Sequence, residues 1–268
     1  MISIENLSFE YGEKAVLGNI SAGLHEGCIY GLLGANGSGK TTLLKLISGM
    51  LFPGQGRITA DGIDTSAREP EALGKIFYMQ SEFRFGKQSL EKFIALHRAF
   101  YPGFSDEILE DCLEKSGINP KTGDLGVLST GEKRKLLFSI ALASGTKYLL
   151  MDEPMNGMDI PSRSLFRKLL LEHLGEDRTA VISTHTPAEM ENILSDILIL
   201  DGKGGLFAKS TEEISDSWCF GLSESDEGAL YSEPCAGGYR TIKKRGEDEA
   251  TGIDLEMLFN ATIKGKLL

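Results

Sequence analysis

Residues 34–41 read GANGSGKT and match the pattern G-x-x-x-x-G-K-[ST]. Glycine lets the backbone approach a ligand closely, so successive N–H groups of such a loop can surround phosphate oxygens. The match directly follows the apolar run 28–33 and opens the helical pattern TLLKLIS, whose N-terminus also favours anions. The segment therefore predicts a loop that binds the phosphates of a nucleoside triphosphate. The residues expected to line it are Gly34, Ala35, Asn36, Gly37, Ser38, Gly39, Lys40 and Thr41.

Three side chains at the end of this loop have separate expected roles. Lys40 should reach the β- and γ-phosphates, and the hydroxyl of Thr41 should bind Mg²⁺. Thr42 is expected to lie within reach of the α-phosphate side of the loop. The alternative is an ordinary glycine-rich turn. A strand pattern before the motif and a helix pattern after it favour the phosphate loop.

Two acids lie at the end of the apolar run YLLMD at 148–152: Asp152 is its last residue, and Glu153 follows it. At the carboxyl end of a strand in an open α/β sheet, side chains face the crevice where ligands bind. Asp152 suits a Mg²⁺ site, reached through a coordinated water, because Mg²⁺ prefers oxygen ligands and keeps waters. Glu153 can orient or activate the water that attacks a phosphate. A strand-end turn with solvated acids is the alternative to this second site.

Short apolar runs alternate with helical patterns along most of the chain. This alternation predicts an α/β fold, a P-loop NTPase domain around a mainly parallel central sheet. Apolar runs buried on both faces are typical of parallel strands. The expected strands cover 28–33, 75–80, 148–152, 179–184 and 196–200, and the expected helices cover 39–49, 89–100, 106–116, 130–143, 161–174 and 187–194.

Three regions depart from this alternation. Residues 1–27 read as two strands around a turn, which predicts an N-terminal antiparallel β subdomain. Residues 81–127 carry two amphipathic helices separated by Pro102 and predict a helical insertion. After a main domain over 1–205, residues 206–268 are expected to form a small C-terminal extension with a terminal helical pattern.

Composition excludes several classes of function. The chain has 268 residues, with 28 basic and 39 acidic residues, and its net charge of −11 argues against a nucleic-acid partner. No apolar run approaches the roughly 18 residues that a membrane-spanning helix needs. The N-terminus lacks the features of a secretory signal. Cys28, Cys112, Cys219 and Cys235 are scattered, which favours reduced thiols over disulfides or a zinc site.

Further motifs occur in a fixed order around the phosphate loop. Together they resemble the ATP-binding-cassette (ABC) ATPases over about residues 1–205, which would then form the ATPase domain. The motifs are Tyr11 near the N-terminus, Gln80 at the end of the strand after the loop's helix, LSTGEKRKL at 128–136, NGMD at 156–159 and STH at 183–185.

The resemblance implies roles for residues within one subunit. Tyr11 would stack on adenine, and Gln80 would touch Mg²⁺ or its water and relay contact to a membrane partner. His185 would contact the γ-phosphate. Each residue also has a simpler interpretation: Tyr11 as a strand-end aromatic, Gln80 as a solvated strand end and His185 as a structural histidine.

The resemblance also implies a second subunit. Ser129 and Gly131, in the signature segment LSTGE, would bind the γ-phosphate held by the opposite subunit. Asp159 would lie across the dimer interface, although it could also only prepare the turn before Pro161. One phosphate loop and one signature per chain imply that two ATP sites need two copies, a homodimer or a pair with a related chain.

The signature departs from the common family form LSGGQ, because Thr130 replaces a glycine and Glu132 replaces the glutamine. Ser129 and Glu132 also form the sequence pattern of a capping box. We expect Glu132 to fold back on this cap, which keeps its charge away from a phosphate. The basic run Lys133, Arg134 and Lys135 is expected to be a solvated helix face rather than a nucleic-acid patch.

The terminal segment 253–263 resembles the end of ATPase subunits of bacterial ABC-2-type exporters. In that family, residues 81–100 would dock a helix of the membrane permease. Phe83, Phe85 and Phe93 are candidate contacts, and core packing is an equally good interpretation of all three.

The sequence thus predicts a Mg²⁺-dependent ATPase that closes around ATP as a two-subunit sandwich and drives export through a separate permease. It would be cytoplasmic and bound to the inner face of the cell membrane through that permease. One alternative is a soluble ABC module in translation or DNA repair, but the tandem cassettes, zinc modules and coiled coils typical of that class are lacking. A regulatory cassette that binds ATP without hydrolysing it is a further alternative, against which Glu153 and His185 argue.

Overall fold

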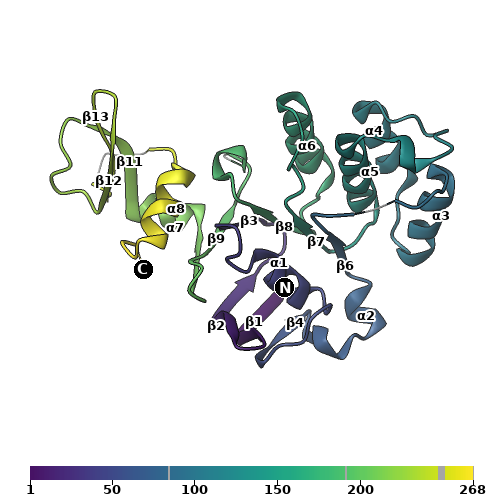
Figure 1. Ribbon diagram of the computed structural model, residues 1–268, viewed down its shortest axis with the longest axis horizontal. Coiled ribbons are helices and arrows are strands. Elements are labelled where there is room, and N and C mark those ends of the chain that lie inside the picture. The colour runs from purple at the N-terminus through teal and green to yellow at the C-terminus, as the bar shows by residue number, and fades with distance from the viewer. Residues whose placement is uncertain (84, 191, 247–250, 268) are drawn as a thin grey trace.

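A twisted six-stranded sheet forms the centre of the molecule (Figure 1). The computed structural model describes residues 1–83, 85–190, 192–246 and 251–267. Five strands are parallel, in the order β9, β3, β8, β7, β6, and β10 pairs antiparallel with β9 at one edge. This confirms the α/β fold expected from the apolar runs. The strands are β3 (Ile29–Gly34), β6 (Ile76–Met79), β7 (Tyr148–Asp152), β8 (Thr179–Thr184), β9 (Asp196–Leu200) and β10 (Leu206–Ser210).

A smaller antiparallel sheet and α1 (Lys40–Ile47) cover one face of the central sheet (Figure 1). Its strand order is β2-β1-β4-β5, so the expected N-terminal β subdomain is confirmed. The strands are β1 (Ile2–Tyr11), β2 (Lys14–Leu24), β4 (Gln55–Ala60) and β5 (Ile63–Asp64), followed by the short helices η1 (Thr65–Ala67) and α2 (Pro70–Leu73).

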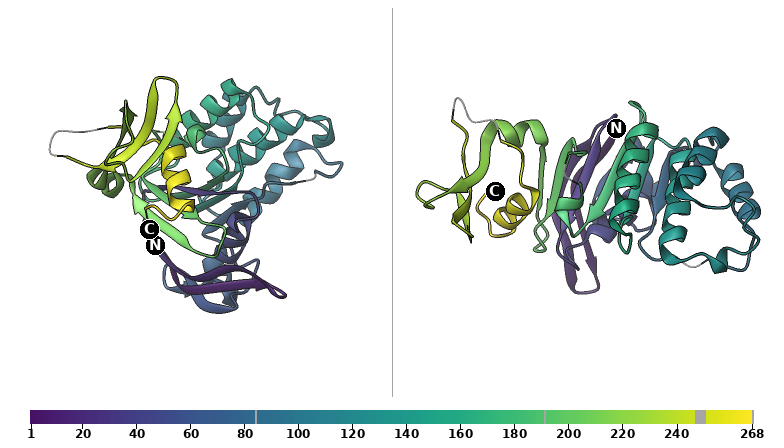
Figure 2. Two further views of the ribbon diagram at one scale, coloured as in Figure 1. Left: turned by 60° about the vertical axis from the view of Figure 1, so that its left-hand side comes forward. Right: turned by 90° about the horizontal axis from the view of Figure 1, so that it is seen from above.

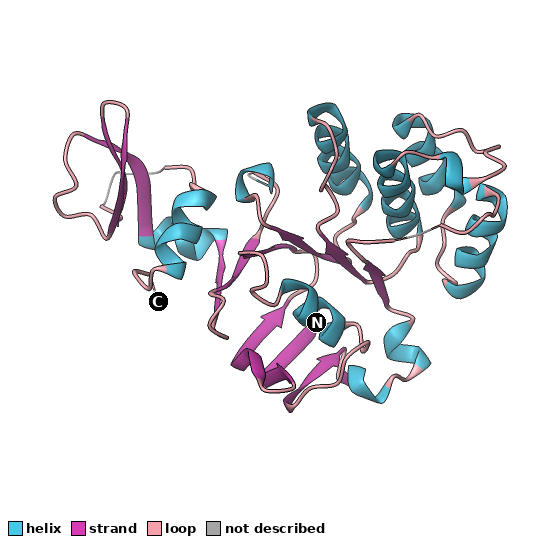
Figure 3. Cartoon of the chain, in the orientation of Figure 1, coloured by secondary structure: helices cyan, strands magenta, loops and turns pink. Residues whose placement is uncertain are grey.

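Helices cover the opposite face, and two of them form the helical insertion (Figure 3). Serine or aspartate side chains cap the N-termini of all four longer helices. The helices are α3 (Leu90–Phe100), α4 (Asp106–Ser116), α5 (Thr130–Ala143) and α6 (Ile160–His173), with the short helix η2 (Leu125–Val127) before α5.

The C-terminal segment lies at one end of the central sheet, and α3 and α4 lie at the other (Figure 2). It shares an apolar core with Leu33, Ile197 and Ile199 of the central sheet. β10 belongs to that sheet, and the three-stranded sheet β11-β13-β12 follows it. A boundary near residue 205 stays a prediction. The elements are α7 (Thr211–Ser217), β11 (Trp218–Ser223), β12 (Tyr231–Cys235), β13 (Gly238–Lys244) and α8 (Leu255–Ile263).

The helix expected over 187–194 is wrong in extent. The structure has only the 3₁₀ helix η3 (Pro187–Met190), and residue 191 lies outside the described residues. Asn192 adopts a φ of 71°, a left-handed conformation that ends a right-handed helix. The apolar residues there pack into the core from an irregular segment instead.

Candidate nucleotide-binding and hydrolytic site

The loop between β3 and α1 has a backbone conformation that depends on glycine and leaves N–H groups available to a ligand. Gly37 and Gly39 adopt φ values of 80° and 106°, which side chains disfavour. A Cβ on Gly34 would lie 2.2 Å from the hydroxyl of Ser38, so this position needs glycine. Gly39 supplies no side-chain cap to α1, unlike the N-cap residues of α3 to α8. The amides that open α1 therefore remain available to an anion.

The buried hydroxyl of Ser38 has no hydrogen-bond partner among the described residues. An unpaired buried polar atom costs free energy, so it indicates a ligand that would complete the site. A phosphate oxygen is such an acceptor, and the surrounding loop is chemically suited to it.

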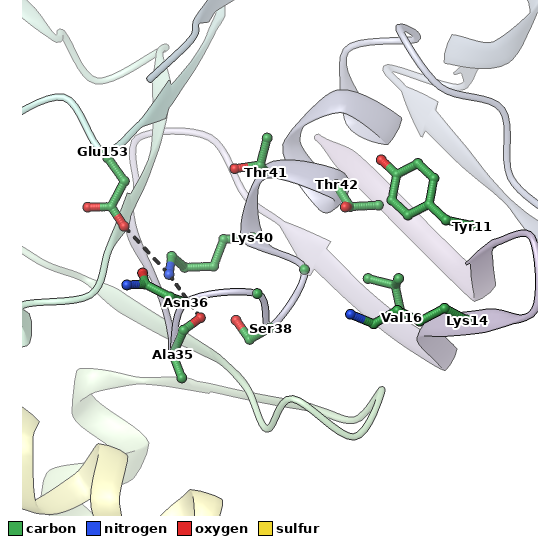
Figure 4. A pocket seen from close by; sticks show the side chains of 12 residues that line it. Tyr11, Lys14, Val16, Ala35, Asn36, Ser38, Lys40, Thr41, Thr42 and Glu153 are labelled. Carbon is green, nitrogen blue, oxygen red and sulfur yellow. Dashed lines mark hydrogen bonds and ion pairs between the residues drawn. The ribbon is translucent and has the colours of Figure 1, made fainter. Parts of the chain in front are cut away.

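A cavity of about 330 Å³ opens over this loop (Figure 4). Tyr11 enters from β1, is 51% exposed, and packs edge-on against Phe9. Sequence analysis did not identify Lys14 and Val16, which reach the cavity only because β2 folds back beside the loop. The lining consists of Tyr11, Lys14, Val16, Ala35, Asn36, Gly37, Ser38, Gly39, Lys40, Thr41, Thr42 and Glu153.

Lys40 is buried, and its side chain points toward Glu153 (Figure 4). Its Nζ donates to the carbonyl oxygens of Gly34 at 2.6 Å and Ala35 at 3.3 Å, and lies 3.5 Å from Oε1 of Glu153. Burial lowers the pKa of Lys40, and the carboxylate of Glu153 opposes this shift. The ammonium group is thus held ready in a place where phosphate charge would compensate its desolvation.

Asp152 ends β7 beside the loop and is almost fully buried. Its Oδ2 accepts a hydrogen bond from Thr41 Oγ1 at 2.7 Å, and its Oδ1 accepts one from Ser183 Oγ at 2.7 Å. The hydroxyl of Ser183 also accepts from the backbone N–H of Glu153 at 2.9 Å. Ser183 was not predicted as a site residue. It was included only as the first residue of the motif STH at 183–185, with no role assigned to it.

Glu153 follows the strand with a φ of 49°, an uncommon conformation for a residue with a side chain. Its Oε2 lies 2.9 Å from Nδ1 of His185, which follows the adjacent strand β8. Its carbonyl oxygen accepts a hydrogen bond from Arg134 at 2.8 Å. The structure therefore brings Lys40, Asp152, Glu153 and His185 to the carboxyl ends of three neighbouring strands, as open α/β sheets place their ligand sites.

The hydroxyl of Tyr78 is a further buried polar atom without a partner among the described residues. Tyr78 lies on β6 beside β7. Burial raises its pKa, and the negative charge of Asp152 adds to this shift. No sequence pattern distinguishes this tyrosine from the apolar residues of the same strand.

Seven predicted site residues are not part of this lining: Gly34, Gln80, Ser129, Gly131, Asp152, Asp159 and His185. Gly34 and Asp152 contact the lining residues Lys40 and Thr41, and His185 contacts Glu153. Gln80 is exposed and lines a second cavity of about 520 Å³ with the segment that follows it. Ser129, Gly131 and Asp159 lie at the N-termini of α5 and α6, away from the phosphate loop's own lining. Their predicted contacts with a nucleotide stay predictions.

The signature segment forms the capping box that its sequence predicts. Glu132 accepts from the backbone N–H of Ser129 at 2.8 Å and from its hydroxyl at 2.7 Å, while Ser129 Oγ accepts from Glu132 N–H at 3.2 Å. These bonds lower the pKa of Glu132. The expectation that Glu132 folds back on the cap is confirmed.

Asp159 caps α6 by accepting the backbone N–H of Ser162 at 2.9 Å, which agrees with its interpretation as a helix start. An additional role across an interface stays a prediction.

The expectation of a uniformly solvated run at 133–135 is wrong for Arg134, which is only 8% exposed. Helical geometry turns this position toward the core, while its neighbours remain partly exposed.

Phe83, Phe85 and Phe93 separate into two groups. Phe93 is buried, and Phe85 packs against the same core. Phe83 instead lines the cavity that contains Gln80. Core packing therefore accounts for two of the three, and only Phe83 stays a candidate contact for a partner.

A second group of possible metal ligands lies between α4 and α6, where Asp111, Cys112 and His173 bring their ligand atoms within 4.8 Å of one another. Asp111 Oδ2 already contacts Lys115 Nζ at 2.8 Å and His173 Nε2 at 2.7 Å. Burial raises the pKa of Cys112 to about 12, which disfavours the thiolate that binds metals. The arrangement is explained by ion pairing between two helices.

Comparison with known proteins agrees with this geometry. The family model described as ABC transporter matches residues 17–156, more than half of the chain. The ABC transporter ATP-binding protein YtrB of Bacillus subtilis is 29% identical over 221 residues, covering 81% of this chain and 75% of YtrB. Nod factor export ATP-binding protein I of Rhizobium etli is 29% identical over 209 residues, covering 75% of this chain and 65% of that protein.

A solved ATP-binding subunit of an ABC transporter has the same fold, with a TM-score of 0.72 at 22% identity, covering 80% of this chain and 91% of that one. The fold, the phosphate loop and the sequence relatives lead to one family. The chain belongs to the ABC transporter family, as an ATP-binding subunit.

Proposed function

We propose that this chain hydrolyses ATP with Mg²⁺ between two subunits and thereby drives transport, in the export direction, through a separate membrane permease. The observation that carries the proposal is the contact of Glu153 with both Lys40, at 3.5 Å, and His185, at 2.9 Å, beside the phosphate loop. A carboxylate in contact with a cation and an imidazole beside this loop supports a role in the attack on a terminal phosphate.

In this proposal, the amides of residues 34–41 hold the phosphates, and Tyr11 stacks on adenine from the open side of the cavity. Thr42, which is buried in the first turn of α1, supports the α-phosphate side. Lys40 moves from Glu153 to the β- and γ-phosphates, because a polyanion competes with one carboxylate for its ammonium group. This movement releases the carboxylate of Glu153.

The donor set at Asp152 fits Mg²⁺. The hydroxyl of Thr41 and the carboxylate of Asp152 lie in contact at 2.7 Å, and both are hard oxygen ligands of the kind that this ion prefers. Thr41 would bind the ion directly, Asp152 through water, and Gln80 would approach from the next strand. Bound Mg²⁺ would neutralise charge on the phosphates.

Glu153 then orients the attacking water or accepts its proton. His185 holds the free carboxylate in place and reaches the γ-phosphate from β8. Because the backbone of Glu153 is anchored at both its N–H and its C=O, little reorganisation is needed at the moment of reaction.

Three residues that do not line the cavity over the phosphate loop of their own chain support the two-subunit arrangement. Ser129, Gly131 and Asp159 lie at exposed helix N-termini, where N–H groups favour a negative ligand. Val127 and Ile160, adjacent in sequence to these termini, are 76% and 80% exposed. Exposed apolar side chains beside an anion site suit a surface that another copy covers.

The cavity at Gln80 and the names of the relatives support the proposal of a permease partner. No helix in the described part of the chain is long and apolar enough to cross a membrane. One relative is named for Nod factor export and another for lantibiotic transport. We propose that a permease docks over residues 80–83 and holds this subunit on the cytoplasmic face of the cell membrane.

Glu153→Gln tests the mechanism. The amide cannot accept the proton, so ATP should stay bound and hold two subunits together, and gel filtration with saturating ATP and Mg²⁺ should show a dimer. Addition of EDTA should return the variant to monomers. Glu107→Gln changes an exposed acid in the first turn of α4 and serves as the control, with hydrolysis unchanged. A Glu153→Gln protein that stays monomeric under these conditions would contradict the sandwich.

A further inference from the structure

Arg134 is buried in a place where an arginine is costly. It belongs to the first turns of α5 and is 8% exposed, although its sequence neighbours are lysines on the partly exposed face. Burial lowers the pKa of Arg134, which reflects the cost of removing a guanidinium group from water. No carboxylate within the described residues forms a salt bridge with it. Other interactions must therefore hold this side chain in place.

Two backbone carbonyl groups accept its hydrogen bonds. Nη1 donates to the carbonyl oxygen of Glu153 at 2.8 Å, and Nη2 donates to that of Ser81 at 2.9 Å. The guanidinium carbon lies 5.6 Å from the centre of the Phe83 ring. One rigid side chain therefore connects three segments: the N-terminal part of α5, the residue after β7 and the loop after Gln80.

The contact with Glu153 has a specific consequence. Glu153 adopts a φ of 49°, and a strained conformation persists only where the surrounding structure holds it. Ser183 accepts from the N–H of Glu153, while Arg134 and the backbone N–H of Asn156, at 3.2 Å, both donate to its C=O. Together they set the direction in which the carboxylate leaves the backbone, toward His185 and Lys40.

The contact with Ser81 connects this site to an open surface. Residues 80–83 line a cavity of about 520 Å³, and Arg134 lines its inner side together with Thr130 and Lys133. A displacement of this loop would pull on the guanidinium group and so on the carbonyl of Glu153. Nε of Arg134 is buried without a partner, so all of its hydrogen bonding in the described structure goes to these two carbonyls.

We propose that Arg134 is a positioning residue that holds the backbone of Glu153 in its strained conformation and transmits movement of the loop 81–83 to the Glu153 carboxylate. This rests on the proposed role of Glu153 in hydrolysis. Arg134 does not line the nucleotide cavity, so it acts only through Glu153.

The test measures ATP hydrolysis by the full chain, with kcat and KM determined separately. Arg134→Gln should lower kcat by about 10- to 100-fold, because misplacement of a reacting group by about 1 Å can have this effect. KM for ATP should change by less than about twofold, since the phosphate loop is untouched. Arg134→Lys should recover only part of kcat, because a single ammonium group lacks the two-pronged geometry that reaches both carbonyls.

A double variant separates positioning from general damage. On the Glu153→Gln background, where the carboxylate is already lost, Arg134→Gln should cause no further fall in residual single-turnover hydrolysis. A further fall by the same factor as in the wild-type background would overturn the proposal. If Arg134→Gln fails to fold, Arg134→Lys on both backgrounds gives the same comparison.

Arg98→Gln is the matched control. Arg98 also lies over a phenylalanine ring, that of Phe104 at 5.8 Å, and pairs with Asp106 far from the nucleotide cavity. Its kcat should equal that of the wild type, and an equal fall in both variants would overturn the proposal. A normal kcat in Arg134→Gln would also overturn it. If Glu153→Gln itself hydrolyses ATP normally, the proposed function fails instead.

Discussion

At the scale of single residues, every polar group of Glu153 is restrained within the protein alone. Its N–H meets Ser183, its C=O meets Arg134, and its carboxylate oxygens meet His185 and Lys40. Donors and charges held in place beforehand stabilise developing charge without reorganising during the reaction. The one contact that nucleotide must disrupt is the pair with Lys40, since that ammonium group is also the expected phosphate ligand.

Ser129→Arg tests the cross-subunit role of the signature at this scale. A large cation at the helix N-terminus should prevent a second phosphate loop from approaching, so ATP hydrolysis should fall by at least about 100-fold. ATP binding to the same chain should persist, because Ser129 does not line its cavity. Steady-state hydrolysis and equilibrium binding of a fluorescent ATP analogue check the two results.

Ser210→Arg provides a matched control for this substitution. Ser210 forms the same capping box with Glu213 at the start of α7, so both variants lose an N-cap worth about 0.5–2 kcal/mol. Only the signature variant should lose hydrolysis. Undiminished hydrolysis by Ser129→Arg would be incompatible with the two-subunit sandwich.

At the scale of elements, ion pairs hold the amino-terminal ends of the central strands β6 and β7, at the end of the sheet opposite the site. Asp61, in the turn between β4 and β5, contacts Lys147 Nζ at 2.8 Å, the hydroxyl of Tyr148 at 2.6 Å and Lys75 Nζ at 3.3 Å. Burial alone would raise the pKa of Asp61, but hydrogen bonds from Lys147, the terminal amino group and Tyr148 outweigh it and hold the pKa well below its usual range. These contacts attach the N-terminal sheet to the start of β7.

Asp61→Asn should lower the free energy of unfolding at pH 7 by about 1.5–3 kcal/mol, because hydrogen bonds to a charged group are lost. Asparagine tolerates the φ of 50° at this position, so the change removes charge without new backbone strain. The difference from wild type should persist down to about pH 4 and shrink below it. A carboxylate whose pKa is lowered in the folded protein stabilises the folded state at pH values above its unfolded-state pKa of about 3.9. This stabilisation is lost as the pH falls further and the carboxylate becomes protonated in the folded protein.

Urea unfolding of both proteins between pH 7 and pH 3 measures this difference. Asp226→Asn, in an exposed loop of the extension, is the control and should unfold like the wild type at every pH. A difference at Asp61 that stays constant down to pH 3 would show that its charge is not responsible.

At the scale of the whole molecule, the residues proposed for the nucleotide site are divided between the cavity over the phosphate loop and two helix N-termini that do not line it. The phosphate loop, Asp152 and Glu153 form one surface, whereas Ser129 and Asp159 belong to helix ends that a single copy does not bring to it. In our proposal, one copy binds nucleotide and two copies together complete the chemistry. The exposed apolar residue Ile160 lies beside Asp159 and is a direct probe of that pairing.

Ile160→Glu, combined with Glu153→Gln, should weaken the ATP-dependent dimer by about tenfold or more, since burying a charge against a partner is unfavourable. An acid in the first turn of α6 favours the helix itself, so the monomer should remain folded. Analytical ultracentrifugation with ATP and Mg²⁺ measures the dissociation constant. Leu222→Glu changes an equally exposed leucine of the extension and should leave the dimer unchanged, whereas unchanged dimerisation of Ile160→Glu would place the interface elsewhere.

Much of the fold was predictable because the strongest elements have strong local signals. The apolar runs of β3, β7 and β8 are buried throughout, and α5 begins at the residue that its capping box indicates. β4, β5 and the sheet β11-β13-β12 were not predicted. These strands have two to seven residues, and none is a continuous apolar run, so pairing with neighbouring strands rather than their own composition makes them strands.

The sequence by itself determined the phosphate loop, the two acids after β7 and the order of the motifs, because each depends on residue types at short spacing. Only the tertiary structure decided that Ser183 holds Asp152 and that Arg134 connects Glu153 to Ser81. These contacts join residues 19 to 53 positions apart. No local pattern can encode such pairs, because sheet order and helix packing, rather than neighbouring residues, bring their atoms together.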